Sequence, residues 1–245
     1  MQEDFSAQLE QQKLEAMKEL AYGASHEINN PLANIAARAQ TLLRDETAPE
    51  RRTSLEAIHQ QAMRAHEMIS DLMLFARPPR LSQESVDLGE LVRNIADDLQ
   101  PELERRSVRL ELRLPATALE IQADPQQLAV AIRALCDNSA NAIGTAGVIE
   151  ITLDSNSDSE TVSLEVADTG SGISAEVREH LFDPFYSGRE AGRGLGFGLS
   201  KCWRIVTDHG GSIVVDDSHN EARDTGAVIT ILLPTDCGPR ADELS

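Results

Sequence analysis

The sequence places a histidine directly beside a glutamate, His26 and Glu27, within the stretch GASHEINNPLANI at residues 23–35. A neutral imidazole nitrogen can act as a nucleophile, and a neighbouring carboxylate can accept a hydrogen bond from the other ring nitrogen. The stretch has the apolar rhythm of a helix, yet Pro31 lacks the N–H that would bond the carbonyl of Glu27. We therefore expect a helix that bends or loosens just after His26.

Helical geometry indicates which way His26 points. At about 100° per residue, Ile28 lies about 40° from Ala24, whereas His26 lies about 200° from it. Ala24 and Ile28 belong to an apolar seam, so His26 is expected on the outward face. Asn30 lies about 40° from His26 and one turn along, where it can address the same chemical group. The alternative is an exposed helix histidine without a role.

A run of alternating glycines, GRGLGFGLS at residues 192–200, opens a predicted helix. Backbone N–H groups at a helix N-terminus, with no Cβ in the way, can hold a phosphate. Each glycine costs roughly 0.5–1 kcal/mol in a regular element, so this run favours a phosphate site over a plain flexible loop. The spacing matches neither the Rossmann nor the P-loop pattern. Arg189 and Arg193 could add positive charge to this site or could simply be solvated.

Two further stretches could complete a nucleotide site. In DTGSGI, residues 168–173, the carboxylate of Asp168 follows a predicted strand and suits an exocyclic amine such as that of adenine. A tight turn explains this motif at least as well. In LCDNSANAI, residues 135–143, Asn138 and Asn141 lie three apart on a helix, and their oxygens suit a hard cation such as Mg²⁺. Helix-surface asparagines without a ligand are the alternative.

Two helices are expected before the domain boundary at Pro79: one over residues 5–44 and, after the break DETAPE at residues 45–50, a second that ends at Arg77. Antiparallel helices with narrow apolar seams cannot bury both seams alone, so we expect a two-fold dimer that forms a four-helix bundle. The alternative is a hairpin packed on its own C-terminal domain. The seam residues are Met17, Leu20, Ala24, Ile28, Leu32, Ile35, Ala39 and Leu42, then Leu55, Ile58, Ala62, Ala65, Ile69, Leu72 and Ala76.

After Pro79, helical patterns alternate with short β-rich runs, which predicts an α/β sandwich with helices on one face of the sheet. Residues 78–86 are expected to form a linker, and the polar residues 155–160 a hairpin loop. The predicted domains are therefore residues 1–79 and 80–240. Strands are expected at 108–114, 147–153, 161–167, 211–216 and 227–233, and helices at 88–104, 126–143 and 195–208.

Composition narrows the compartment and the class of partner. The net charge of −19 disfavours direct binding to nucleic acid or anionic membranes, whereas a basic protein partner would be tolerated. Cys136, Cys202 and Cys237 are few, odd in number and lack metal-ligand spacing, which favours a reducing compartment. No apolar run approaches the roughly 18 residues of a membrane span, and the polar N-terminus is no signal peptide. We expect a soluble, cytoplasmic chain that relies on another protein or an upstream segment for any sensing.

Five short motifs, in this order, resemble the boxes of the sensor histidine kinases of two-component signalling. They read HEINNPL, LCDNSANA, DTGSGI, FDPFYS and GRGLGFGL. The resemblance covers the chain from about residue 10 to residue 234. It implies a helical dimerisation and histidine phosphotransfer domain followed by an ATP-binding domain of the gyrase type.

The resemblance implies roles for individual residues. His26 matches the phosphorylated histidine, Glu27 the acidic neighbour that assists transfer, and Asn30 the polar residue that orients water for dephosphorylation of the partner. Asn138 matches the Mg²⁺-binding asparagine, and Asp168 the adenine-binding aspartate. The ATP-lid glycines match Gly170, Gly172, Gly194, Gly196 and Gly198, its hydrophobic box matches Phe182 and Phe185, and Gly192 and Arg189 complete the expected cofactor-binding set.

Two positions depart from the family pattern. Ala134 stands where the family often has a second polar residue, one turn before the Mg²⁺-binding asparagine. Ser187, Gly188 and Arg189 stand where the family has Thr-Thr-Lys, and the fork of an arginine differs in geometry from the ammonium of a lysine.

The resemblance implies autophosphorylation of His26 from Mg²⁺-ATP and transfer of the phosphoryl group to an aspartate of a response regulator, together with phosphatase activity towards that partner. A bend at Pro31 would let the helix change shape between the two activities. Two other classes stay open. A scaffold that binds ATP weakly is favoured by Ala134, and an ATPase driven by nucleotide-dependent dimerisation is disfavoured by the histidine motif.

Overall fold

The computed structural model describes residues 23, 25, 27–76, 79–156, 161–183, 186, 198–216 and 226–236. The described residues divide between Pro79 and Arg80 into two compact units, a helical unit and an α/β unit. Six of the expected site residues lie outside the described residues: His26, Phe185, Arg189, Gly192, Gly194 and Gly196.

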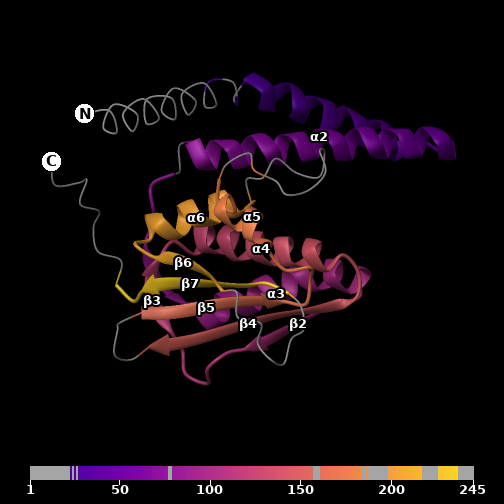
Figure 1. The fold of residues 1–245 in the computed structure, drawn as a ribbon. Coiled ribbons are helices and arrows are strands. Elements are labelled where there is room, and N and C mark those ends of the chain that lie inside the picture. The colour runs from indigo at the N-terminus through magenta and orange to yellow at the C-terminus, as the bar shows by residue number, and fades with distance from the viewer. Residues whose placement is uncertain are drawn as a thin grey trace. The chain divides into compact units, whose positions relative to one another are not determined.

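The helical unit is a hairpin of two helices (Figure 1). Its first helix covers residues 27–45, and α2 covers Pro49–Ala76. The predicted break over residues 45–50 is too long, because only residues 46–48 connect the helices. Pro49 begins α2 since a proline in the first turn has a helical φ and lacks an N–H that would find no partner there.

Two hydrogen bonds fix the antiparallel register of the hairpin. Arg52 Nη1 donates to the carbonyl of Leu43 at 3.4 Å, and His59 Nδ1 lies 3.1 Å from the carbonyl oxygen of Ala36. A carbonyl only accepts, so His59 carries a hydrogen on Nδ1. Among the described side chains of the hairpin, the alanines Ala36, Ala39 and Ala62 are buried. Side chains this small let two helices approach closely.

Larger apolar side chains of the helical unit remain at the surface. Ile28, Ile35, Leu42 and Ile58 belong to the predicted seam, and their exposed fractions lie between 42% and 59%. One neighbouring helix covers only a narrow stripe, so a wider apolar face stays exposed. This agrees with the expectation that the two helices cannot bury their seams alone. Burial of this face in a dimer stays a prediction.

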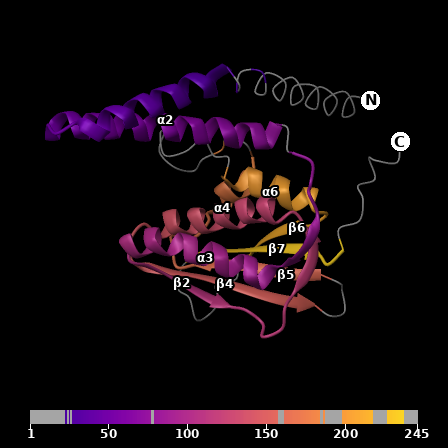
Figure 2. The same cartoon turned by 180° about the vertical axis from the view of Figure 1, so that it is seen from behind.

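The α/β unit is built on a five-stranded sheet with the order β2-β4-β5-β7-β6, parallel between β2 and β4 and antiparallel elsewhere. The strands are β2 (Val108–Arg113), β4 (Gly147–Asn156), β5 (Thr161–Asp168), β6 (Ser212–Asp216) and β7 (Val228–Pro234). Helices α3 (Leu88–Arg105), α4 (Pro125–Ile143) and α6 (Gly198–Asp208) cover one face (Figures 1 and 2). The predicted α/β sandwich is confirmed. No helix within the described ranges is long and apolar enough to cross a bilayer.

Alternation along the strands gives the sheet one apolar face. Val162, Leu164 and Val166 of β5 are buried, as are Ile132 and Leu135 of α4. Burying side chains of this size contributes about 1.5–3 kcal/mol each. The α/β unit therefore has a hydrophobic core of its own.

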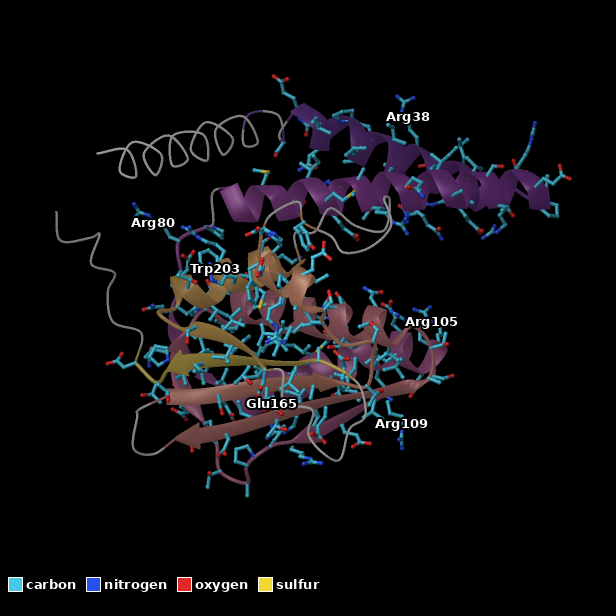
Figure 3. The ribbon with its side chains drawn as sticks, in the orientation of Figure 1. Arg38, Arg80, Arg105, Arg109, Glu165 and Trp203 are labelled. Atoms are coloured by element: carbon cyan, nitrogen blue, oxygen red, sulfur yellow. The ribbon has the colours of Figure 1, made fainter. Side chains whose placement is uncertain are left out.

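The intervening positions give the sheet an opposite, polar face. Figure 3 labels Arg109 of β2 and Glu165 of β5, which alternate with buried or half-buried residues of the same strands. On this face, Arg113 forms an ion pair with Glu150 at 2.7 Å. This face of the sheet is therefore lined by charged side chains.

Three short elements are absent from the sequence prediction: β1 (Glu84–Asp87), β3 (Glu120–Ala123) and α5 (Ala175–Glu179). Strands β1 and β3 form a separate antiparallel pair. The predicted linker over residues 78–86 is therefore wrong from Glu84 onward. Elements of four or five residues are too short for a period to stand out from chance.

Candidate functional site

Asp168 ends strand β5 with its side chain inside the α/β unit, only 3% exposed. Its Oδ1 accepts hydrogen bonds from the N–H groups of Gly170 at 2.8 Å and Ala227 at 3.3 Å. No described residue donates to its Oδ2. The carboxylate is thus held by one oxygen, and the other can accept a hydrogen bond from a ligand.

Glycines let three chain segments meet at Asp168. A Cβ at Gly170 would lie 2.7 Å from the carbonyl carbon of Ala142 on α4, and one at Gly226 would lie 1.8 Å from the carbonyl oxygen of Asp168. Gly172 and Gly226 have φ angles of 73° and 125°, which other residues rarely adopt. Gly226 is a site residue that the sequence prediction lacks, since a single glycine before a strand is its only signal.

Helix α4 places Asn138 beside this turn. Asn138 is half-buried and lies one turn before Ala142, hence on the helix face that meets Gly170. Asn141 is exposed, and Ala134, one turn before Asn138, is buried. The fold therefore brings together the expected adenine-binding and metal-binding segments, without a polar side chain at position 134.

Charged side chains of α4 itself and of neighbouring segments act on the same stretch of α4. Burial raises the pKa of the Asp137 carboxyl, and the negative charge of Glu102 raises it further. The positive charges of Lys201 and two arginines lower it. Lys201 of α6 thus lies close enough to act on the segment that carries Asn138.

The segment expected to form the ATP lid is described only at its two ends. Gly198 is the first residue of α6, and a Cβ there would meet no atom within 4 Å. Packing of the described residues gives no reason for a glycine at this position, whereas the close approach of a ligand would. Phe182 is half-buried beside the buried Leu181, just after α5.

The helical unit presents the other expected residues at its surface. Glu27 and Asn30 are both exposed. The helix continues through Pro31 and onward to residue 45. No measurement on the described residues tests the bend expected after His26, so the bend stays a prediction.

Two families match the two units. Residues 16–80 match the His Kinase A (phospho-acceptor) domain, and residues 123–236 match the family of histidine kinase-, DNA gyrase B- and HSP90-like ATPases. The chain is also 32% identical, over 95% of its length, to the sensor histidine kinase ZraS of Klebsiella oxytoca. The chain belongs to the histidine kinase family.

Other histidine kinases have a similar sequence identity to this chain. The chain is 30% identical to sporulation kinase D of Bacillus subtilis over 92% of its own length and 43% of that protein. It is 33% identical to the sensor protein kinase PilS of Pseudomonas aeruginosa over 79% of its own length and 37% of that protein. It covers 49% of the length of ZraS. The chain thus spans about half, or less, of the curated histidine kinases that it matches.

Solved histidine kinases have the same fold. Full-length ShkA in complex with AMPPNP superposes with a TM-score of 0.77 at 23% identity, over 91% of this chain and 47% of that one. The catalytic domain of ThkA superposes with a TM-score of 0.56 at 26% identity, over 63% of this chain and 97% of that one. ThkA in complex with the response regulator TrrA superposes with a TM-score of 0.65 at 22% identity, over 92% of this chain and 64% of that one.

Proposed function

We propose that this histidine kinase chain binds ATP in its α/β unit, phosphorylates His26, and passes the phosphoryl group to an aspartate of a response regulator. The observation that carries the proposal is Asp168, a buried carboxylate with one oxygen held by two backbone N–H groups and the other without a described donor. This arrangement suits the exocyclic amine of adenine. The matched ATPase family over residues 123–236 supports the same assignment.

The phosphates would lie near the start of α6. Gly198 leaves open space at that helix N-terminus, where backbone N–H groups favour negative charge. Gly192, Gly194, Gly196 and Arg189 belong to the same proposal, with Phe182 and Phe185 as the hydrophobic side of the lid and Gly170 and Gly172 shaping the turn beside adenine. Lys201, one turn further along α6, adds positive charge.

His26 is the proposed nucleophile. Its neutral ring nitrogen would attack the γ-phosphorus as the bond from that phosphorus to the β,γ-bridging oxygen breaks, which leaves ADP. Glu27, exposed beside it, would accept a hydrogen bond from the second nitrogen and stabilise the positive charge that develops on the ring. Asn30 is exposed one turn along, where it would orient water for the phosphatase reaction.

The half-buried Asn138 is the side chain proposed to hold Mg²⁺. Its amide oxygen is the type of ligand that Mg²⁺ accepts, and the Asp168 turn lies against the same face of α4. When bound, the ion would offset negative charge on the phosphates. Phosphate oxygens of the nucleotide are of the same hard oxygen type and would supply further ligands.

The proposed domains are residues 1–79 for dimerisation and histidine phosphotransfer and residues 80–240 for ATP binding. The exposed apolar face of Ile28, Ile35, Leu42 and Ile58 supports a homodimer with a four-helix bundle. The complex of ThkA with a response regulator supports that class of partner. A cytoplasmic location, and an upstream sensor domain or separate sensor protein, complete the proposal.

A scaffold without kinase activity is the second candidate. The observation that favours it is Ala134, buried one turn before Asn138, where the family pattern often has a polar residue. A scaffold of this kind would retain the dimer and bind nucleotide weakly or without consequence.

Incubation with γ-labelled ATP and Mg²⁺ separates these functions. The kinase predicts acid-labile, base-stable label on the protein that disappears in His26→Gln. Bound nucleotide without label would favour the scaffold, and steady phosphate release without label would favour an ATPase.

The variant Asp168→Asn tests the nucleotide site by itself. Asparagine keeps an acceptor for the two backbone N–H groups but turns an amide donor towards the adenine amine, so nucleotide affinity should fall with the fold intact.

A further inference from the structure

The chain that enters the α/β unit from the helical unit is tied down before its first strand begins. The backbone N–H of Ser82 donates to Oδ2 of Asp124 at 2.9 Å. Ser82 precedes β1, which starts at Glu84. Asp124 is only 6% exposed and directly follows β3, the pairing partner of β1. A hydrogen bond to a buried carboxylate is stronger than one between neutral groups.

The same carboxylate caps helix α4. Oδ1 of Asp124 accepts from the backbone N–H groups of Gln126 and Gln127, each at 3.0 Å. Oδ2, which binds Ser82, also accepts from Gln127 Nε2 at 3.3 Å. One carboxylate therefore ends the linker and begins the helix that carries Asn138.

A buried histidine holds Asp124 from the other side. The N–H of Asp124 donates to His209 Nε2 at 3.0 Å, and His209 Nδ1 lies 2.8 Å from the carbonyl oxygen of Ile205. Nε2 accepts and Nδ1 must donate, so the ring is the neutral tautomer with its hydrogen on Nδ1. His209 follows the last residue of α6. Asp124 thus connects Ser82 of the linker to the N-terminus of α4 and, through His209, to the C-terminus of α6.

A second helix cap in the same unit lacks the extra bond. Asp87 caps α3 by accepting from the N–H groups of Gly89 at 2.8 Å and Glu90 at 3.4 Å. Both N–H groups that donate to Asp87 belong to the first turn of its own helix. Asp87 and Asp124 therefore share a capping role and differ in the bond to the linker.

We propose that Asp124 is a positioning residue for phosphoryl transfer, because it fixes where the linker leaves the α/β unit, and that His209 holds it in place. The proposal rests on the proposed kinase function. Without the Ser82 bond, residues 82 and 83 are no longer held to the start of α4, and each could add up to about 3.3–3.6 Å to the span of the linker. A longer, less directed linker lowers the effective concentration of His26 at the nucleotide. Asp168 and its glycines are unaffected, so nucleotide affinity should not change.

The test compares Asp124→Asn with Asp87→Asn in the full chain. Asparagine caps helices about as well as aspartate, but it would turn an amide donor towards the N–H of Ser82. In Asp124→Asn we expect the rate of His26 labelling at saturating ATP to fall about tenfold, with nucleotide affinity within about twofold of wild type. In Asp87→Asn both should stay near wild type. Equal losses in the two variants, or a rate that falls in parallel with affinity, would assign Asp124 a structural role only.

His209 offers a second, independent variant. His209→Gln can keep an acceptor for the N–H of Asp124, whereas His209→Leu cannot. We expect His209→Leu to lower the labelling rate as Asp124→Asn does and His209→Gln to restore much of it. A rate in His209→Leu equal to that of wild type would overturn the role given to the histidine.

Hydrogen exchange tests the bond between Ser82 and Asp124 without an activity assay. The amide of Ser82 should exchange faster in Asp124→Asn and at the wild-type rate in Asp87→Asn; an unchanged rate in Asp124→Asn would overturn the inference. A wild-type chain that binds nucleotide but never labels His26 would instead overturn the proposed function, and the positioning role with it. A wild-type chain that labels His26 as fast as Asp124→Asn does would overturn only the positioning role.

Discussion

The two units of this chain bury their side chains in different ways. The α/β unit encloses branched apolar residues such as Leu135 and Ile231 almost completely. The helical unit buries alanines between its helices and leaves Ile35 and Leu42 about half exposed. A sheet covered by helices makes a core within one chain, whereas two helices alone make only a narrow contact. The α/β unit should therefore be stable by itself, and the helical unit should depend on a partner surface.

The largest effect is expected at Gly226 of the α/β unit. A Cβ in Gly226→Ala would lie 1.8 Å from the carbonyl oxygen of Asp168, at a φ that alanine rarely adopts. We expect the free energy of unfolding to fall by about 3 kcal/mol or more. Nucleotide binding should be lost as well, because the same turn holds Asp168. Fluorescence of Trp203, the single tryptophan, during urea unfolding reports on this unit (Figure 3).

The matched control is Gly198→Ala, where the added Cβ meets no atom within 4 Å. Its unfolding free energy should stay within about 1 kcal/mol of wild type, because only helix propensity changes. If Gly226→Ala proved as stable as Gly198→Ala, the close approach at Asp168 would be wrong.

The next largest effect is expected on the proposed dimer. Ile35→Asp puts a charge on the exposed apolar face of the helical unit. We expect the dissociation constant of the dimer to rise at least about tenfold, with the unfolding of the α/β unit unchanged. Sedimentation across a concentration series measures the first quantity, and Trp203 fluorescence the second. Gln40→Asp, also on an exposed position of this helix, is the control; equal weakening in both variants would locate the dimer contact elsewhere.

A smaller effect is expected from pH and is confined to the α/β unit. Burial lowers the pKa of His209, although the hydrogen bond to Ile205 and the charge of Asp124 oppose the shift. The unfolded chain, with an ordinary histidine, binds the proton more readily than the folded one. The contribution of His209 to stability should therefore be fully present above about pH 6.5 and be lost as the pH drops below it. Urea midpoints from Trp203 fluorescence across this range should show a flatter profile in His209→Gln; the same slope in both proteins would remove His209 as the cause.

The smallest effect is expected at a surface pair of the helical unit. Arg52 and Glu56 form an exposed ion pair at 3.1 Å, four residues apart on α2. Such pairs contribute little because water screens the charges, so Arg52→Gln should cost about 0.5 kcal/mol or less. Thermal unfolding followed by circular dichroism measures the change. A loss above about 2 kcal/mol would mean that the bond from Arg52 to Leu43 matters more than the exposure of these side chains suggests.

The sequence predicts the larger elements well because their periods are long enough to count. Helices α3 and α4 and the five strands of the main sheet lie within a few residues of their predicted bounds. The turn of Asp168, Gly170 and Gly172 after a strand is also marked in the sequence, whereas Gly226 is not, and the role of this turn in nucleotide binding stays a prediction. The short pair β1 and β3 is not predicted, since four residues cannot establish a period and their pairing joins distant parts of the chain.

By itself, the sequence determined the order of the five motifs, the helical pattern around His26 and the alternation that gives the sheet an apolar face. These are local properties, set by neighbouring residues and their spacing. Only the tertiary structure decided that Gly226 lies against Asp168, that Gly170 lies against α4, and that Asp124 joins Ser82 to His209. Each of these contacts joins residues at least 28 positions apart, so packing of the whole unit, and no local pattern, brings them together.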